Sequence, residues 1–330
     1  MKNVYVNIII VNYNCCEETI ACLNSLLKST VTNFRIFIVD NNSTDSSVAL
    51  LLNWGLPHQI KHVKSSEIEN QKLPNNITKD NPKFVLVENP ENNGFSAGNN
   101  IAIYFLLNTT TGDSDYIWLL NPDTVVQPEV LSNLIDKAVN KKKLILGNLI
   151  VDYANHNRIM FYGGFSIKQY THGVVRIVEE KNINKLDAIT GASIFTNIST
   201  FQDLDVLPQN YFMYWEETDF CTKAKQAGYT FEVNTKSKIF DHVGATSNSN
   251  FLREYLYLLN GLRFYKKYYL AYLPTILIST VAKYFKALFF EDKVKQLAIF
   301  YAHIDFFKII FAKKVDVLQR IQTQNKKLDE

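Results

Sequence analysis

The feature that most constrains the fold is a regular alternation of strand-like and helix-like segments over the first 150 residues. Short apolar runs rich in β-branched residues predict strands at 4–12, 34–40, 84–88, 115–120 and 144–151. Intervening segments predict helices at 17–28, 44–53, 96–107 and 128–140. Strands that alternate with helices indicate a mostly parallel sheet with helices on both faces, so the chain is predicted to be α/β. The polar, turn-rich stretch 64–83 is predicted to be a loop.

The pattern changes twice beyond residue 150. From about 158 to 195 the strand-like pieces are short and separated by turns, and from Phe251 onward the chain is aromatic, basic and helical. Residues 251–330 carry fourteen Lys and Arg against seven Asp and Glu, whereas the whole chain has a net charge of only +3. A basic tail on a mildly acidic body predicts a domain boundary at 250 and a partner for the tail, such as an anionic membrane surface.

The stretch "YYLAYLPTILISTVAKYFKALFF" is long enough to span a bilayer, but Pro274, Lys283 and Lys286 interrupt it. Lysines near a membrane centre cost about 2.5–3.5 kcal/mol each on insertion scales. We therefore predict an interfacial pair of amphipathic helices. A soluble helical subdomain packed on the body, or a homodimer surface, would also fit this composition.

The four cysteines fit no zinc spacing and suggest no disulfide framework, which favours reduced thiols in the cytoplasm. The segment "VYVNIIIV" is interpreted as a buried strand and not as a signal peptide. We therefore expect a cytoplasmic protein, held peripherally on the inner face of the cell membrane. Nucleic-acid binding is not expected, because the basic residues are confined to a tail rich in aliphatic side chains.

Polar side chains stand where four predicted strands end. The ends read "VNYN", "VDNNSTD", "NPENNGFSAGNN" and "LLNPDT". Asp and Asn commonly cap the following helix, which would explain one such end but hardly four. In open α/β sheets, ligands bind beyond the carboxyl ends of the strands. The sequence therefore predicts a ligand site at this edge.

Each strand end has a plausible role in binding a nucleotide. Asp40 can accept hydrogen bonds from a base or a ribose hydroxyl, while Asn93 and Asn99 offer donors and acceptors. Gly94 allows close approach of a ligand to the backbone. Neither GxxxxGK[ST] nor GxGxxG is present, so a diphosphate would need a metal, and Asp123 suits Mg²⁺ or Mn²⁺.

A second acidic cluster lies in "YFMYWEETDFCTKAKQAGY", residues 211–229. Acids in a first helical turn favour the positive end of the helix dipole, and Gly228 is typical of a helix end. Glu216 and Glu217 cannot both be buried cheaply, however. At least one of them should face solvent or a ligand.

Taken together, "VNYN", "VDNNSTD", "NNGFSAGNN", "LLNPDT", "TGAS" and "WEETDF…AGY…H" resemble family 2 glycosyltransferases over about residues 5–250. The likeness is greatest to the rhamnosyltransferase-like branch of bacterial surface-polysaccharide synthesis. The resemblance implies a GT-A fold and transfer of a sugar from a nucleotide-sugar to an acceptor hydroxyl, with inversion. It implies a catalytic domain at 1–250, with a nucleotide-binding half at 1–150 and an acceptor and catalytic half at 151–250, followed by the helical region 251–330.

The resemblance and the strand-end residues together predict the donor site. Its members are Val11, Tyr13, Asp40, Asn42, Asn93, Gly94, Asn99, Asn121, Gly191 and Ala192. By resemblance, Val11 and Tyr13 border the base. Gly191 and Ala192 form a tight wall beside the donor sugar.

The metal motif of the family, Asp-X-Asp, falls on Asn121-Pro122-Asp123. Asn121 departs from it and leaves Asp123 as the main carboxylate ligand, which implies a weaker metal site. His242 matches a position that often completes this site. A histidine ligand favours Mn²⁺ over Mg²⁺.

The catalytic base implied by the resemblance is Glu217, with Glu216 as the reserve. A carboxylate there would take the proton of the acceptor hydroxyl. Asp219 is predicted to orient the acceptor or to hold the helix. Tyr214 and Trp215 offer flat faces on which an acceptor sugar could stack, although such clusters are also ordinary core.

The sequence thus predicts an inverting, metal-dependent glycosyltransferase that uses a UDP- or dTDP-sugar, with dTDP-rhamnose as one candidate. The acceptor would be a glycan or a polyprenyl-linked glycan. A nucleotidyltransferase on a similar fold is disfavoured, because "VNYNCCEE" follows the first strand in place of a glycine-rich basic loop. A non-catalytic nucleotide-sugar or glycan-binding relative is the alternative, supported by Asn121.

Overall fold

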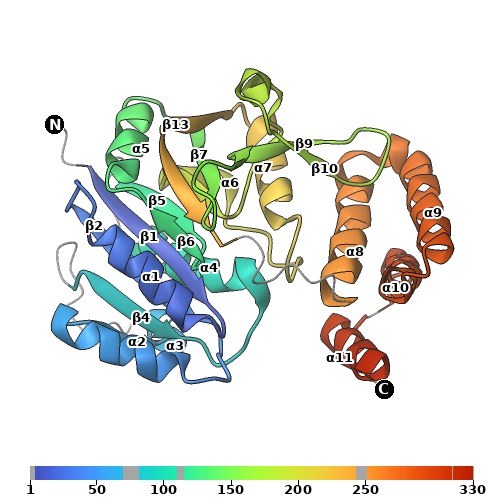
Figure 1. Ribbon diagram of the computed structural model, residues 1–330, viewed down its shortest axis with the longest axis horizontal. Coiled ribbons are helices and arrows are strands. Elements are labelled where there is room, and N and C mark those ends of the chain that lie inside the picture. Colours follow the sequence, from blue (N-terminus) through green and yellow to red (C-terminus); the bar gives the residue numbers. More distant parts are fainter. Residues whose placement is uncertain (1–3, 70–81, 110–114, 243–250, 314, 330) are drawn as a thin grey trace. The chain divides into compact units, whose positions relative to one another are not determined.

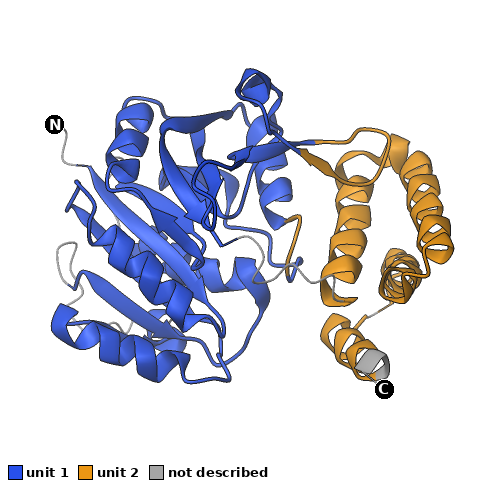
Figure 2. Ribbon diagram, in the orientation of Figure 1, with its two compact units in different colours: residues 1–166, 176–212, 216–243 blue, residues 167–175, 213–215, 244–330 orange. Residues whose placement is uncertain are grey.

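The computed structural model describes residues 4–69, 82–109, 115–242, 251–313 and 315–329 (Figure 1). These residues form two compact units (Figure 2). Unit 1 comprises residues 1–166, 176–212 and 216–243, and unit 2 comprises 167–175, 213–215 and 244–330. The chain therefore passes from one unit to the other several times. The predicted boundary at 250 lies outside the described residues, as do residues 70–81 of the predicted loop.

The chain up to His242 holds strands and helices in alternation. In order they are β1 Tyr5–Asn12, α1 Cys16–Leu26, β2 Phe34–Asp40, α2 Ser47–Gly55, η1 Leu56–His58, β3 Lys61–Lys64, α3 Ser65–Glu69, β4 Phe84–Glu88, α4 Gly94–Thr109, β5 Asp115–Leu120, β6 Thr124–Val126, α5 Val130–Ala138, β7 Leu144–Asp152, β8 Ile159–Tyr162, β9 Gly164–Ile167, β10 Val174–Arg176, η2 Glu180–Lys185, β11 Ala188–Ile189, β12 Ser193–Asn197, α6 Ser199–Leu204, α7 Glu216–Gln226 and β13 Thr230–Asp241.

The main sheet has the strand order β3-β4-β2-β1-β5-β12-β7-β13-β6, with β8 beside β7. Strands β3, β4, β2, β1 and β5 run parallel to one another. Strand β12 enters antiparallel between β5 and β7, and β13 then pairs parallel with β7. A smaller sheet has the order β10-β9-β11. The predicted mostly parallel sheet is therefore confirmed.

Alternate residues of the central strands face two different helical layers. Ile8, Ile36 and Trp118 join the cluster formed with buried residues of α1, α2 and α5. On the other face Phe37 contacts Phe105 of α4, with ring centroids 5.5 Å apart. Because both faces are covered, β2 is buried at every position, which explains its continuous apolar run.

The predicted strands at 34–40, 84–88 and 115–120 are confirmed to the residue. The prediction of a loop at 64–83 is wrong at its start, where β3 ends and α3 follows. The Glu67 carboxylate accepts a hydrogen bond from the Lys64 N–H, and Ile68 is buried, which together stabilise this short helix. Strand β6 was also missed, because it follows directly on the turn residues Pro122 and Asp123.

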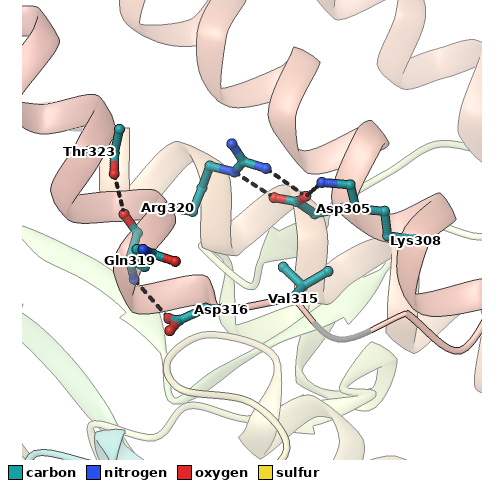
Figure 3. A pocket seen from close by; sticks show the side chains of 7 residues that line it. All are labelled: Asp305, Lys308, Val315, Asp316, Gln319, Arg320 and Thr323. Carbon is teal, nitrogen blue, oxygen red and sulfur yellow. Dashed lines mark hydrogen bonds and ion pairs between the residues drawn. The ribbon is translucent and has the colours of Figure 1, made fainter.

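Unit 2 contains the predicted C-terminal helices, α8 Phe251–Tyr268, η3 Leu270–Tyr272, α9 Leu273–Phe289, α10 Lys293–Ile310 and α11 Val317–Asp329. Asp305 of α10 is fully buried and pairs with Arg320 of α11 (Figure 3). Its carboxylate accepts hydrogen bonds from two guanidinium nitrogens of Arg320 at 2.9 and 3.0 Å, which Figure 3 shows. It also accepts a hydrogen bond from the Tyr255 hydroxyl of α8 at 2.9 Å. Burial alone would raise the pKa of Asp305, but the bonds from Arg320 and Tyr255 outweigh it and lower that pKa.

Among the described residues, no helix has the length and apolarity needed to cross a membrane.

Candidate active site

The carboxyl ends of the parallel strands meet at one edge of the sheet. In the register of β1 with β2, Asn12 lies opposite Asp40, and Asp40 in turn lies opposite Glu88 of β4. The buried Asp40 carboxylate accepts hydrogen bonds from the Asn12 amide at 2.7 Å and from the Ser43 hydroxyl at 2.6 Å. Asp40 therefore ties two strand ends together, while its contact with a base or ribose stays a prediction.

The loops after β1 and β2 are hydrogen-bonded to each other and leave several side chains exposed to solvent. The side-chain amide oxygen of Asn14 accepts a hydrogen bond from the Thr44 N–H at 2.8 Å. Asn14 and Asn42 both have positive φ, at 52° and 63°, which Asn tolerates better than most residues. Tyr13 and Asn42 are exposed, so both are free to meet a ligand at this edge.

The start of α4 packs closely against other parts of unit 1. Gly94 has φ +87°, and a Cβ atom there would collide with the carbonyl oxygen of Phe212, which accepts a hydrogen bond from the Phe95 N–H at 3.0 Å. A Cβ atom on Gly98 would lie 2.9 Å from Val11. These glycines thus allow close approach of chain segments, and the donor-binding role of Gly94 stays a prediction. Of the neighbouring amides, Asn93 is exposed and can meet a ligand.

Asn99 lies deeper in the same helix. It is buried and its amide donates to the Phe95 carbonyl oxygen at 2.9 Å, a bond within α4. One side of this amide is therefore already used for helix structure. Direct contact of Asn99 with a donor stays a prediction.

The turn between β5 and β6 presents Asp123. One of its carboxylate oxygens is buried and has no hydrogen-bond partner. Burial raises the pKa of Asp123, and a hydrogen bond with the Asn121 side chain and the nearby His242 partly oppose that rise. The His242 N–H donates to the Asp123 carbonyl oxygen at 3.2 Å, and the His242 ring stacks on Tyr153 with centroids 3.6 Å apart. The structure thus brings the three predicted metal-site residues together.

A partnerless buried carboxylate oxygen fits a divalent cation, which would satisfy it. Among the described residues, no three His, Cys, Asp or Glu side chains are grouped so that they could hold a metal ion. A cation beside Asp123 could also contact Asn121 and His242, and its remaining ligands would come from other molecules such as water.

The two acids at the start of α7 lie in different environments. Glu216 is buried, has one carboxylate oxygen without a partner, and has a pKa raised well above its usual value by burial and by the charge of Glu217. Glu217 keeps part of its surface open, and burial of the rest raises its pKa to about 7. A pKa near neutrality suits a general base.

Gly191 and Ala192 connect the two acidic regions. The position that a Cβ atom on Gly191 would occupy lies 3.4 Å from the Phe95 ring and 4.0 Å from the Cβ atom of Glu217. The carbonyl oxygen of the next residue, Ala192, accepts a hydrogen bond from the Asn121 N–H at 3.0 Å. Two consecutive residues thus link the base candidate to the metal candidate.

The remaining predicted side chains are engaged within the protein. Asp219 is buried and accepts a hydrogen bond from the Tyr211 hydroxyl at 2.9 Å, which supports the helix-holding alternative without testing acceptor contact. Trp215 is 2% exposed and belongs to unit 2, where its ring contacts other aromatic rings. Stacking of a sugar on Trp215 stays a prediction that requires these rings to part. Tyr214 is only half-buried.

Three residues near this site were missed. Asp241 precedes His242, and burial together with the charge of Asp123 raises its pKa to about 7. Asn41 donates hydrogen bonds to the Asn92 side chain at 2.9 Å and to the Gly94 carbonyl oxygen at 3.1 Å. Phe95 lies against Gly191. An acid or amide at a strand end was the available signal for Asp241 and Asn41, whereas Phe95 had no distinctive one.

Comparison with known proteins gives likenesses in both sequence and structure. A family model described as "Glycosyl transferase family 2" matches residues 7–197. The low-salt glycan biosynthesis hexosyltransferase Agl10 of Haloferax volcanii is 23% identical over 227 residues, covering 67% of this chain and 61% of that protein. The rhamnosyltransferase WbbL of Escherichia coli is 26% identical over 147 residues, covering 41% of this chain and 55% of that protein. The chain thus matches little more than half the length of each curated relative.

Solved structures resemble this one in fold. GalNAc-T7 with UDP, GalNAc and Mn²⁺ has a TM-score of 0.58 and 14% identity, over 80% of this chain and 48% of that one. The mannosyltransferase PcManGT of Pyrobaculum calidifontis, in complex with GDP-Man and Mn²⁺, has a TM-score of 0.56 and 12% identity, over 94% of this chain and 88% of that one. The expected GT-A fold is confirmed by these likenesses.

Proposed function

Because this chain belongs to glycosyl transferase family 2, we propose that it transfers a sugar from a nucleotide-sugar to an acceptor hydroxyl, with inversion at the anomeric carbon. The observation that supports this most is the link from Glu217 through Gly191 and Ala192 to Asn121 and Asp123. In-line displacement needs a base on one side of the reacting carbon and charge stabilisation of the leaving group on the other. The two acidic regions supply candidates for both.

Glu217 is the proposed base, which takes the proton of the acceptor hydroxyl as it attacks. Asp123, with Asn121 and His242, would hold a divalent cation, Mn²⁺ or Mg²⁺, whose chemistry there is to neutralise charge on the leaving diphosphate. Gly191 has no side chain to fill the space beside Glu217 and Phe95, which leaves room for the donor sugar. Asp40, Tyr13 and Asn42 would contact the nucleoside at the ends of β1 and β2.

The donor is proposed to be a UDP- or dTDP-sugar, and the rhamnosyltransferase WbbL among the relatives makes dTDP-rhamnose one candidate. The acceptor is proposed to be a glycan or a polyprenyl-linked glycan in surface-polysaccharide synthesis. The glycan-biosynthesis hexosyltransferase Agl10 supports an acceptor of this class.

Titration of UDP, dTDP, GDP and CMP into the full chain, with and without Mn²⁺, tests the proposed donor site. We expect UDP or dTDP to bind, and Mn²⁺ to tighten the binding. If no nucleotide binds to folded protein under either condition, the proposal fails and a non-catalytic glycan-binding relative becomes the better hypothesis. Calorimetry reports affinity, and circular dichroism confirms that the protein is folded.

We further propose that unit 2 places the enzyme peripherally on the cytoplasmic face of the membrane, through α9. Ile278, Val281, Phe285 and Phe289 recur at helical spacing on one face and are 69%, 44%, 63% and 82% exposed. The basic residue Lys286 is exposed on the same helix. An apolar stripe with basic neighbours suits an anionic lipid surface. A second copy of the chain suits it less, because lysines would then approach lysines.

Sedimentation with phosphatidylcholine vesicles, with and without phosphatidylglycerol, tests this surface. The double variant Phe285→Ser/Phe289→Ser should bind anionic vesicles at least about tenfold more weakly, because a buried Phe contributes about 1.5–3 kcal/mol. The control Leu56→Ser changes a residue that is 73% exposed in unit 1, and it should bind as the wild type does. If the wild-type chain does not bind vesicles, and light scattering shows that it forms dimers, the membrane proposal is contradicted.

A further inference from the structure

The two residues that precede the acids of α7 have an unusual backbone. Tyr214 and Trp215 have φ values of +69° and +77°, and neither is glycine. Such conformations cost about 1–3 kcal/mol each and persist only where the surroundings hold them. The chain continues from Trp215 directly into Glu216 and Glu217, the first residues of α7. Whatever holds this turn therefore also affects where α7 begins.

Asn260 of α8 holds the carbonyl groups of the turn. Its buried amide nitrogen donates to the Met213 carbonyl oxygen at 2.8 Å and reaches the Tyr214 carbonyl oxygen at 3.4 Å. The amide oxygen accepts a hydrogen bond from Arg263 at 3.2 Å. Because a guanidinium can only donate, Arg263 turns the oxygen of Asn260 toward itself and the nitrogen toward the turn.

Trp215 anchors the end of the turn in the same helix. Its indole N–H donates to the Tyr257 carbonyl oxygen at 2.8 Å. Its ring packs against Phe264 at 5.0 Å between centroids, and against Tyr265 and His172 at 5.6 and 5.5 Å. A buried aromatic ring with its N–H satisfied is a strong anchor.

The residue before the turn is held separately within unit 1, where the Phe212 carbonyl oxygen accepts from the Phe95 N–H. The path from Phe212 to Glu216 is thus constrained at each step. We propose that Asn260 and Trp215 are positioning residues, through which α8 keeps Tyr214 and Trp215 in their left-handed conformation and so places Glu217 for proton transfer. This inference rests on the proposed function of Glu217. It gives the C-terminal helices a part in catalysis besides membrane attachment.

Two variants test the inference. Asn260→Leu removes the amide donor at similar volume, and Trp215→Phe removes the indole N–H but keeps an aromatic ring. The assay measures nucleotide release from dTDP-rhamnose and from UDP-glucose with Mn²⁺. We expect kcat to fall about 10- to 100-fold in each variant, because small misplacement of a catalytic group has effects of that size. The KM for the donor should stay within about twofold, since the donor site itself is unchanged.

Thr280→Val is the matched control. Thr280 is buried in the same unit, and its hydroxyl pairs with the His303 ring nitrogen at 2.9 Å, far along the sequence from the turn. This variant loses a buried hydrogen bond, as Asn260→Leu does, and should keep the wild-type kcat. If Thr280→Val lowers kcat as much as Asn260→Leu, general destabilisation explains the loss and the inference is overturned.

Hydrogen exchange gives a readout that does not depend on activity. The amides of residues 213–219 should exchange at least about tenfold faster in Asn260→Leu than in the wild type. Their exchange rates in Thr280→Val should equal those of the wild type. If exchange in Asn260→Leu is unchanged, the inference is overturned even where kcat of this variant falls. A wild type that releases no nucleotide from either donor would count against the proposed function, while exchange would still decide whether α8 holds the turn.

Discussion

We expect Glu217→Gln to lower the rate of sugar transfer by about 10²- to 10⁴-fold, the usual contribution of a positioned general base. Glutamine keeps the shape of the side chain beside Gly191 but cannot accept the proton of the acceptor hydroxyl. Binding of the donor, measured by calorimetry, should stay nearly unchanged, because the nucleotide and diphosphate are held elsewhere. A large loss of donor affinity in Glu217→Gln would show a structural residue and not a base.

The wild-type rate should also rise with pH and level off above about 7. Burial raises the pKa of Glu217 to about 7, and only the ionised carboxylate accepts a proton, so the active fraction grows as the pH passes through that value. A pH profile of kcat/KM reports this transition in the free enzyme. A flat profile between pH 5.5 and 8.5, at constant Mn²⁺, would contradict the assignment.

Glu216→Gln is the control for both measurements. Burial and the charge of Glu217 raise the pKa of Glu216 well above its usual value, which favours the protonated carboxyl, and a neutral amide resembles that acid in size and charge. We expect the rate to stay within about threefold of the wild type. Because a raised pKa makes the folded state favour the proton, the stability contributed by Glu216 is lost as pH rises, and the variant should lose less stability toward alkaline pH. A rate loss confined to Glu216→Gln would make Glu216 the base.

We expect Asp123→Asn to remove the effect of Mn²⁺ on nucleotide binding. A divalent cation held by Asp123 would neutralise charge on the diphosphate and contribute several kcal/mol, so the affinity of this variant for UDP or dTDP with Mn²⁺ should fall by at least about 100-fold. Without Mn²⁺ the variant and the wild type should bind equally. The measurement is the same nucleotide titration, repeated with the variant at saturating Mn²⁺.

The stability of Asp123→Asn separates a ligand role from a structural one. The wild-type carboxylate is mostly buried, has an oxygen without a partner and has a raised pKa, so its charge lowers the stability of the metal-free protein. The neutral variant should therefore unfold at an equal or higher temperature. Asp152→Asn is the control, because Asp152, the last residue of β7, pairs with Arg158 at 3.4 Å. This variant should leave the Mn²⁺ effect intact. An unchanged Mn²⁺ effect in Asp123→Asn would refute the proposed ligand.

The parts of the fold that could be predicted from the sequence are those with a strong local signal. Strand β2 is buried at every position, so its apolar run marked its ends to the residue. Strand β6 has only three residues and owes its pairing to β13, more than a hundred residues away. No local pattern in the sequence predicts such a pairing. Helix α3 was missed for a different reason, because its short sequence lies among polar residues typical of a loop.

The residues of the candidate site likewise fall into those with a local sequence signal and those without one. Asp123 and Glu217 could be named because an acid at a strand end and an acid pair behind aromatic residues are visible in the sequence, and because the family likeness assigned their roles. Asn260 could not, since its contacts with residues 213 and 214 span almost fifty positions and nothing near it in the sequence points to them. Trp215 was noticed, but the choice between a stacking surface and a buried anchor depends on tertiary packing.

The passage of the chain between its two units has a consequence for its synthesis on the ribosome. Residues 167–175 and 213–215 belong to unit 2, yet they are translated before α8, α9, α10 and α11. When the chain has emerged from the ribosome as far as residue 243, all of unit 1 is available to fold, while Trp215 and His172 still lack α8, whose rings pack against them. Chaperones that bind exposed aromatic side chains therefore have a defined target during this interval, and a prematurely terminated chain keeps that target permanently.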